Sequence, residues 1–152
     1  MIDLDDTDRA ILRALIADGG LNAREVGAAV GLSQPAAWRR VRRLEEAGVI
    51  RGRRLVLDRA KLGWTVTVHV GIRLAAKGRL DVEAFERAVQ AIPEVQVVQH
   101  VLGVFDYRLL VVAHDLADFE RILRRRILTL PGVGSVESNV ELSDEKTAGP
   151  PV

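Results

Sequence analysis

The chain has 152 residues, of which 48% are hydrophobic and 28% charged, and it contains no cysteine. This length allows one ordinary domain or two small ones, and the apolar fraction argues against a wholly disordered chain. The absence of any run of about 18 apolar residues argues against a membrane-spanning helix. The acidic start lacks the features of a signal peptide, and without cysteine there are no disulfides or thiolates. We therefore expect a cytoplasmic protein that does not contact membranes.

Positive charge is concentrated in one short segment. The net charge of the chain is only +1, whereas residues 33–54 carry seven arginines against two glutamates. A dense arginine cluster in a nearly neutral chain is typical of a surface that faces phosphate groups. Charge alone allows an equally simple alternative, a solvated helix face stabilised by arginine–glutamate pairs.

Two short helices are predicted at the start of the chain. The first spans residues 4–17, where apolar side chains recur at helical spacing before a Gly-Gly pair. Its apolar side consists of Ile11, Leu12, Leu15 and Ile16. Asn22 and Glu25 have the spacing of a capping box, which predicts a second helix that ends near Val30.

A third helix carries most of the arginines. Ser33 is a suitable N-cap, and the helix is predicted to end at Ala47, before Gly48. Its predicted core-facing stripe consists of Ala37, Val41 and Leu44. The arginines expected to point away from that stripe are Arg39, Arg40 and Arg43. A short turn between two helices, followed by an arginine-rich helix, is what a helix-turn-helix requires.

The third helix and the basic residues after it form the predicted surface for double-stranded DNA. Such side chains reach base edges in the major groove or the flanking phosphates. The candidate DNA-binding residues are Ser33, Gln34, Ala36, Arg39, Arg40, Arg43, Arg51, Arg53 and Arg54. Trp38 is expected to pack beside the apolar stripe, and Arg42 to pair with Glu46 one turn later. Residues 55–58 are predicted to form a short strand or a wing hairpin.

The second half of the chain is predicted to follow the order βαββαβ. Helices are expected to begin at Asp81 and after Asp115, and each ends in a Pro-x-Val sequence. The predicted strands cover about 65–74, 95–102, 107–113 and 135–142. This order predicts a ferredoxin-like sheet of four antiparallel strands with two helices on one face. We expect a second subunit to cover the other face.

The fold class expected for the whole chain is therefore α+β, with an N-terminal winged helix-turn-helix and a C-terminal ferredoxin-like domain. The expected boundaries are 1–50 for the DNA-binding domain, 51–63 for the wing and linker, 64–142 for the ferredoxin-like domain and 143–152 for a flexible tail.

No catalytic or metal-binding motif accompanies these elements. His69, His100 and His114 lie in separate predicted segments without metal-ligand spacing, so we expect local hydrogen bonds and no metal or other cofactor. Gly103 and Asp106 stand out because they lie in the tight link between the two central strands. From the residues alone, turn formation explains both of them: glycine supplies an unusual backbone angle and aspartate caps the turn. A ligand contact is the alternative.

Five motifs of the chain occur in the order found in one protein family. They are LDDTDRAIL (4–12), VGLS (30–33), RVRRLEEAGVI (40–50), GVFDY (103–107) and LPGV (130–133). Residues 4–142 thereby resemble the Lrp/AsnC family, also called feast/famine regulators. The resemblance implies a winged helix-turn-helix joined to a ligand-sensing RAM domain in a transcriptional regulator. It also implies a homodimer, which in many members assembles into an octamer.

The resemblance further implies a small-molecule effector, an amino acid in many members, bound at the interface between dimers. The Gly-x-x-Asp link of the family falls on Gly103 and Asp106, where backbone N–H groups would meet a carboxylate and Asp106 an ammonium group. The implied effector-binding residues are Gly103, Val104, Asp106, Tyr107, Val136 and Ser138. The family usually presents two hydroxyl residues on the last strand, whereas this chain has Val136 and Ser138. That departure allows an apolar ligand, a different amino acid or no ligand.

Two alternatives to an effector-modulated regulator are open at this point. Siroheme decarboxylases share the two-domain plan, but they carry histidines around the central link, where this chain has residues 103–108 and His100 comes too early. An architectural DNA-binding protein would share the DNA surface and lack the effector. The sequence favours the regulator and predicts no enzymatic activity.

Overall fold

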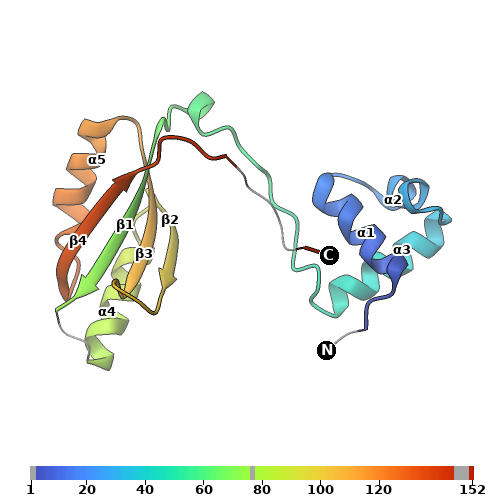
Figure 1. Cartoon of the computed structure of the whole chain (residues 1–152), viewed down its shortest axis with the longest axis horizontal. Coiled ribbons are helices and arrows are strands. Elements are labelled where there is room, and N and C mark those ends of the chain that lie inside the picture. Colours follow the sequence, from blue (N-terminus) through green and yellow to red (C-terminus); the bar gives the residue numbers. More distant parts are fainter. Residues whose placement is uncertain (1–2, 76–77, 146–150) are drawn as a thin grey trace. The chain divides into compact units, whose positions relative to one another are not determined.

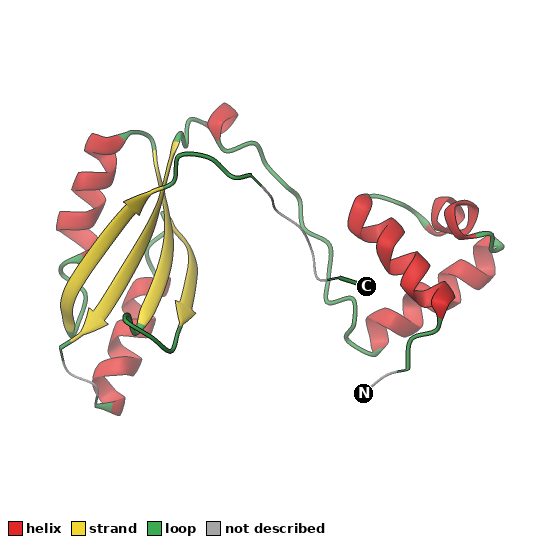
Figure 2. Cartoon of the chain, viewed as in Figure 1, coloured by secondary structure: helices red, strands yellow, loops and turns green. Residues whose placement is uncertain are grey.

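The structure, a computed structural model, describes residues 3–75, 78–145 and 151–152. The chain divides into two compact units, Met1–Val56 with Lys146–Val152, and Leu57–Glu145. The helices and strands of each unit are labelled in Figure 1 and coloured by type in Figure 2. Among the described residues, no helix combines the length and the apolar character that crossing a membrane requires.

The first unit consists of three helices, as predicted. They are α1 (Asp6–Ala17), α2 (Ala23–Val30) and α3 (Gln34–Glu46). Helix α1 begins at Asp6, later than predicted, because Asp5 and Asp8 form a capping box around its first turn. The predicted capping box of α2 is confirmed: Glu25 N–H donates to Asn22 Oδ1 at 3.1 Å, and Asn22 N–H donates to Glu25 Oε2 at 2.8 Å.

The apolar stripe of α3 packs where the sequence places it. Its residues Ala37, Val41 and Leu44 are buried with Ile11, Leu12 and Val26 in one core. Ile16, predicted on the same side of α1, is instead 49% exposed because it lies near the end of that helix. Gly31 turns the chain between α2 and α3 with φ of 72°, a conformation that glycine adopts without strain. Burial of the stripe fixes which side of α3 faces outward.

The segment after α3 differs from the prediction. Residues 51–58 form neither strand nor helix, so the expected strand or wing hairpin at 55–58 is wrong. Leu55 and Val56 are 85% and 93% exposed. A strand needs a partner to satisfy its backbone groups, and no described segment of this chain pairs with these residues. A short 3₁₀ turn, η1 (Ala60–Leu62), follows.

The second unit has the predicted βαββαβ order. Its elements are β1 (Val66–Leu74), α4 (Arg79–Gln90), β2 (Val95–His100), β3 (Tyr107–Ala113), α5 (Leu116–Ile122), the π-helical turn η2 (Leu123–Ile127) and β4 (Val133–Val140). The strands pair antiparallel in the order β2-β3-β1-β4, the ferredoxin-like arrangement. Asp115 caps α5 as predicted, with Oδ1 accepting from Asp118 N–H at 2.7 Å.

Both helices cover the same face of the sheet. Val68, Val70 and Ile72 of β1 are buried together with Phe85 of α4 and Phe119 of α5. Alternate residues of the strands face the other side, and they include the exposed polar side chains of His69, Arg73 and Arg108. The apolar residues of β1 are therefore already buried under the helices and do not need a second subunit to cover them. The homodimer stays a prediction.

Half of the predicted flexible tail at 143–152, residues 146–150, lies outside the described residues. Val152 belongs to the first unit. Arg13 Nη1 donates to the carbonyl oxygen of Val152 at 3.1 Å, and Val152 packs against the three-helix core. At its described end, the chain therefore contacts α1.

Candidate nucleic-acid interface and ligand site

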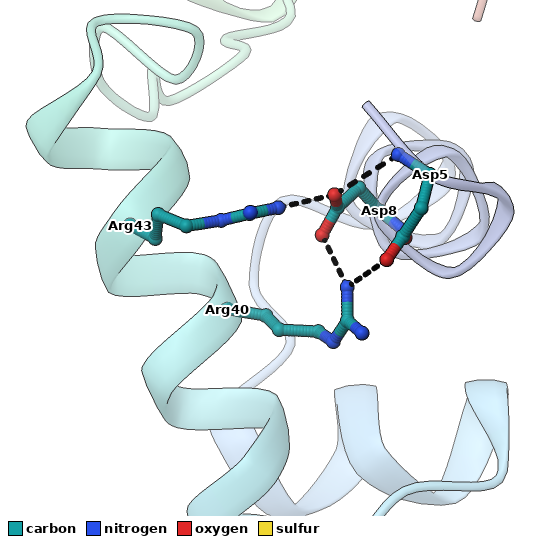
Figure 3. A network of polar contacts seen from close by, with 4 residues as sticks. All are labelled: Asp5, Asp8, Arg40 and Arg43. Atoms are coloured by element: carbon teal, nitrogen blue, oxygen red, sulfur yellow. Dashed lines mark hydrogen bonds and ion pairs between the residues drawn. The ribbon is translucent and has the colours of Figure 1, made fainter. Parts of the chain in front are cut away.

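An ion-pair network joins α3 to the start of α1 (Figure 3). Arg40 Nη1 lies 2.7 Å from Asp5 Oδ2 and 2.9 Å from Asp8 Oδ1, and Arg43 Nη2 donates to Asp8 Oδ2. The Asp8 side chain is fully buried, whereas those of Arg40 and Arg43 are 33% and 49% exposed. Two partly exposed cations thus surround one buried carboxylate.

This network corrects the expectation that Arg40 and Arg43 point freely into solvent. Residues three apart lie on one flank of a helix, and this flank of α3 meets the first turn of α1. Asp8 is held there by its capping box, and a buried carboxylate is stable only when cations and hydrogen bonds compensate its charge. The spacing of Asp5 and Asp8 signals the capping box in the sequence. Their pairing with side chains more than 30 residues away has no local signal.

The charged state of the network is favoured on both sides. The Arg40 guanidinium lowers the pKa of the Asp5 carboxyl, and the N–H of Asp8 lowers it further. In return, the hydrogen bonds to Asp5 and then Asp8 raise the pKa of Arg40. Both pKa shifts favour the ionised forms of Asp5 and Arg40 and therefore the ion pair between them.

Arg39 differs from its neighbours on α3. It is exposed on the side of the helix away from the core, and among the described residues it has no ion-pair partner. Arg42 pairs with Glu46 at 3.0 Å, as predicted. The Arg42 guanidinium also lies 5.9 Å from the centre of the Trp38 ring. Trp38, which was expected to pack beside the apolar stripe, is 54% exposed. Its position at the margin of the stripe leaves much of the ring outside.

The remaining predicted DNA-binding residues lie at the start of α3 or in the segment after it. Ser33 is at the N-cap position without a side-chain capping bond, and Gln34 and Ala36 lie in the first turn. Arg53 Nη1 donates to the carbonyl oxygens of Gly19 and Leu21, at 3.1 and 2.8 Å, so this arginine holds the turn between α1 and α2. Arg51 and Arg54 are exposed in the segment after α3.

The Gly103–Asp106 link is fastened to the end of β1. Asp106 N–H donates to the Ile72 carbonyl oxygen at 2.9 Å, and Asp106 Oδ2 accepts from Leu74 N–H at the same distance. Arg73 Nη2 donates to the Val104 carbonyl oxygen at 2.8 Å. Gly103 has φ of 156°, which favours glycine. These bonds agree with the turn-forming interpretation of Gly103 and Asp106.

Gly71 is a second glycine with a structural role in this region, and no local pattern in the sequence indicates it. The Phe105 side chain covers Gly71 of β1, and a Cβ atom at Gly71 would come within 2.7 Å of the Phe105 ring. Only glycine fits below that ring without a shift of the backbone or the ring. The contact therefore holds the link down on the helix-free face of the sheet.

Tyr107 points the other way, toward α4. It is 1% exposed, its hydroxyl donates to Glu86 Oε1 at 2.6 Å, and its ring stacks on His100 with a centroid distance of 4.7 Å. Burial, together with the hydrogen bond to Glu86, raises the pKa of Tyr107 to about 12. Glu86, His100 and Tyr107 line an open hollow of ≈ 560 Å³.

The last two predicted effector residues lie on β4. Val136 pairs with Ile72 and Ser138 with Val70, so β1 separates both of them from Asp106, which directly precedes β3. Two strand spacings amount to about 10 Å. One chain therefore does not bring the six predicted effector residues together at a single point.

The three histidines occupy local roles. His69 Nε2 lies 2.7 Å from Glu141 Oε2, and His114 Nδ1 lies 2.8 Å from the Gly63 carbonyl oxygen. These two confirm the prediction of local hydrogen bonds, whereas His100 stacks on Tyr107. In the described part of the chain, no three histidine or carboxylate side chains gather where they could hold a metal ion.

The two units together define a class of protein: a transcriptional regulator with a helix-turn-helix DNA-binding unit and a separate ferredoxin-like ligand-binding unit. Residues 4–51 match the winged helix-turn-helix DNA-binding domain, and residues 67–151 match the Lrp/AsnC ligand binding domain. The chain belongs to the Lrp/AsnC family.

Similar proteins cover nearly the whole chain. A proline dehydrogenase transcriptional activator of Rhodobacter capsulatus is 37% identical over 93% of this chain and 93% of its own length. The leucine-responsive regulatory protein of Escherichia coli K12 is 38% identical over 95% and 88% of the two chains. The crystal structure of the transcriptional regulator NMB0573 of Neisseria meningitidis, in complex with L-Met, superposes with a TM-score of 0.91. It has 27% identity and covers 96% of this chain and 94% of that one.

Proposed function

We propose that this regulator binds its DNA through the outward side of α3 and that an amino acid modulates the binding. The placement of Arg39 is the main support for DNA binding through α3. The buried stripe of α3 turns this arginine outward, and no described carboxylate neutralises it. A free cation at that place on a helix-turn-helix suits a base edge or a phosphate. As a DNA-binding protein, it would act in the cytoplasm.

The proposed DNA interface keeps all predicted residues but divides them by role. Arg39 is proposed to meet DNA with a free guanidinium, and Arg40 and Arg43 with groups already bound to α1. Arg53 is proposed to contact phosphate while it holds the turn between α1 and α2. The others in the interface are Ser33, Gln34, Ala36, Arg51 and Arg54.

A gel-shift titration with the region upstream of the protein's own gene tests this proposal. Specific binding should weaken steeply as salt rises, because each phosphate contact releases counterions and adds about −0.9 to the slope of log K against log[salt]. If neither the upstream region nor genomic fragments enriched on the protein bind in a salt-dependent way, the DNA-binding proposal is wrong.

The effector is proposed to bind beside the Gly103–Asp106 link, with Val104, Tyr107, Val136 and Ser138 contributing. The solved complex of NMB0573 with L-Met supports an amino acid as the ligand class. Val136, where the family usually has a hydroxyl, favours an apolar side chain on that amino acid. Because β1 lies between Asp106 and the β4 residues, a pocket that uses all of them would need a second chain. We therefore propose a homodimer, and size-exclusion chromatography with light scattering distinguishes it from the octamer that the resemblance also allows.

A thermal-shift screen of the twenty amino acids tests the effector proposal. A ligand at 100 times its dissociation constant stabilises the fold by about 2.7 kcal/mol. Asp106→Asn is the matched variant, because its amide oxygen can still accept from Leu74 N–H while the charge is lost. The variant should keep DNA binding and lose the response. No stabilisation by any amino acid would reject this part and favour an architectural role.

We propose a DNA-binding domain of residues 1–50, a linker of 51–63, and a ferredoxin-like domain of 64–142 for effector binding and oligomerisation. The named relatives are regulators, which favours this role over the siroheme decarboxylase alternative, and no cofactor is proposed.

A further inference from the structure

We propose that Asp8 is a positioning residue for DNA binding: its buried carboxylate fixes Arg40 and Arg43 so that both guanidinium groups face DNA phosphates in one preset geometry. The inference rests on the proposed function of α3. It adds a role for a residue of α1, which does not itself need to touch DNA.

The hydrogen bonds to Asp5 and Asp8 leave other N–H groups of Arg40 and Arg43 available for phosphate. Arg40 uses Nη1 for both Asp5 and Asp8, and Arg43 uses Nη2 for Asp8. A guanidinium carries five N–H donors in a rigid plane, so each arginine keeps other donors for a second anion. Figure 3 shows both side chains extending from α3 toward Asp8, one helical turn apart. A long side chain held in this way loses less freedom when it binds a phosphate.

Burial argues that Asp8 stays bound to the arginines when DNA arrives. If Asp8 only blocked the arginines, its ion pairs with them would have to break before the arginines could bind phosphate. Asp8 is fully buried and also accepts the N–H of Asp5, so neither water nor a new partner reaches it. Breaking a buried ion pair is strongly unfavourable. Asp5 is 53% exposed, and it is the partner that phosphate could displace.

Asp8→Asn separates positioning from simple charge effects, because the two predict opposite signs. Removal of a negative charge near DNA should by itself strengthen binding. If Asp8 positions the arginines, the variant binds a 30-base-pair duplex from the upstream region roughly fivefold to tenfold more weakly, a part of the loss expected when an arginine contact disappears. Its salt slope should also fall by up to about 1. Equal or tighter binding by Asp8→Asn overturns the proposal.

Two controls exclude a loss of folding as the cause. Asp6→Asn removes the same charge from the same turn of α1, where Asp6 is exposed and has no ion pair among the described residues, and it should not weaken binding. In a background with Arg40→Ala and Arg43→Ala, Asp8→Asn should cause no further loss, since the residue acts through these arginines. A further loss there overturns the proposal in favour of a purely structural role. The active fraction of each variant is measured by stoichiometric titration.

Arg40→Lys keeps the test decisive if Asp8→Asn does not fold. Lysine preserves the charge and can pair with Asp8, but it lacks the planar set of donors. We expect a loss of affinity of roughly fivefold, in the range of a lost directional contact. Wild-type affinity in Arg40→Lys would show that a point charge suffices and would overturn the positioning role. If the wild-type protein itself fails to bind DNA, the proposed function fails instead.

Discussion

The two units use a motif aspartate in different ways. Asp8 of the first unit is buried between helices and binds two arginine side chains from a distant segment. Asp106 of the second unit binds the backbone N–H of Leu74 on the adjacent strand. The first arrangement orients side chains that can act on a ligand, whereas the second holds a turn in place. The same residue type therefore organises a surface in one unit and a backbone in the other.

The two candidate sites differ accordingly in completeness. The outward side of α3 and the charges that orient it come from one three-helix unit. The predicted effector residues instead lie on both sides of β1, and Tyr107 faces α4. One chain thus supplies all residues of the proposed DNA surface, while the proposed ligand site would gain residues from an assembly.

Asp8→Ala should have the largest effect on stability. It leaves Arg40 and Arg43 without their shared partner and removes one of the two hydrogen bonds of the α1 capping box, from Asp5 N–H to the Asp8 carboxylate. We expect a loss of about 2–3 kcal/mol in the free energy of unfolding, less than for a fully buried pair because the arginines can hydrate. Denaturant unfolding followed by circular dichroism measures it. Asp6→Ala, the control in the same turn, should cost below about 1 kcal/mol; equal losses for both variants would contradict the special role of Asp8.

Asp106→Ala should cost less, since it removes the partly buried acceptor of the Leu74 backbone N–H and, among the described residues, leaves no buried cation unpaired. We expect about 1–2 kcal/mol in the same measurement. Asp106→Asn should recover most of this loss, because the amide oxygen still accepts from Leu74. If Asp106→Ala lowered the free energy of unfolding more than Asp8→Ala does, the expected order of the two aspartates would be wrong.

Tyr107 gives a spectroscopic test of the second unit, because it is the only tyrosine in the chain. Burial and Glu86 raise its pKa to about 12, from 10.0 in an exposed phenol. The unfolded chain loses this proton at lower pH than the folded one. The stabilising contribution of the neutral phenol is therefore complete below pH 10 and is lost as pH rises through 12. Absorbance at 295 nm should titrate near pH 12 in the folded protein and near 10 in denaturant; a single midpoint near 10 in both would place Tyr107 at the surface.

The fold could be predicted largely from the sequence. Helical spacing placed the buried Ala37, Val41 and Leu44, and cap residues such as Asn22 and Asp115 marked helix starts. These signals are local and repeat along the chain, so a single sequence carries them. The strand predicted at 55–58 is wrong because alternating or apolar residues indicate a strand only if a partner is available.

The sites were less predictable because their geometry depends on contacts between distant segments. Periodicity turned Arg40 and Arg43 away from the core, but it carries no information about Asp5 and Asp8 across the helix interface. Likewise, the contact of Phe105 with Gly71 joins a residue of the Gly103–Asp106 link to a residue of β1. Pattern gives the direction of a side chain relative to its own helix or strand, and only the packed structure shows which partner it meets.

The salt dependence of DNA binding by Arg39→Ala tests the central claim, that the outward side of α3 is the DNA surface. The variant removes an exposed cation without an ion-pair partner among the described residues, so the unfolding midpoint should not change. Affinity for the upstream duplex should fall by about 1–3 kcal/mol, and a lost phosphate contact would reduce the slope of log K against log[salt] by about 0.9. Wild-type affinity and slope in this variant would show that α3 does not face DNA.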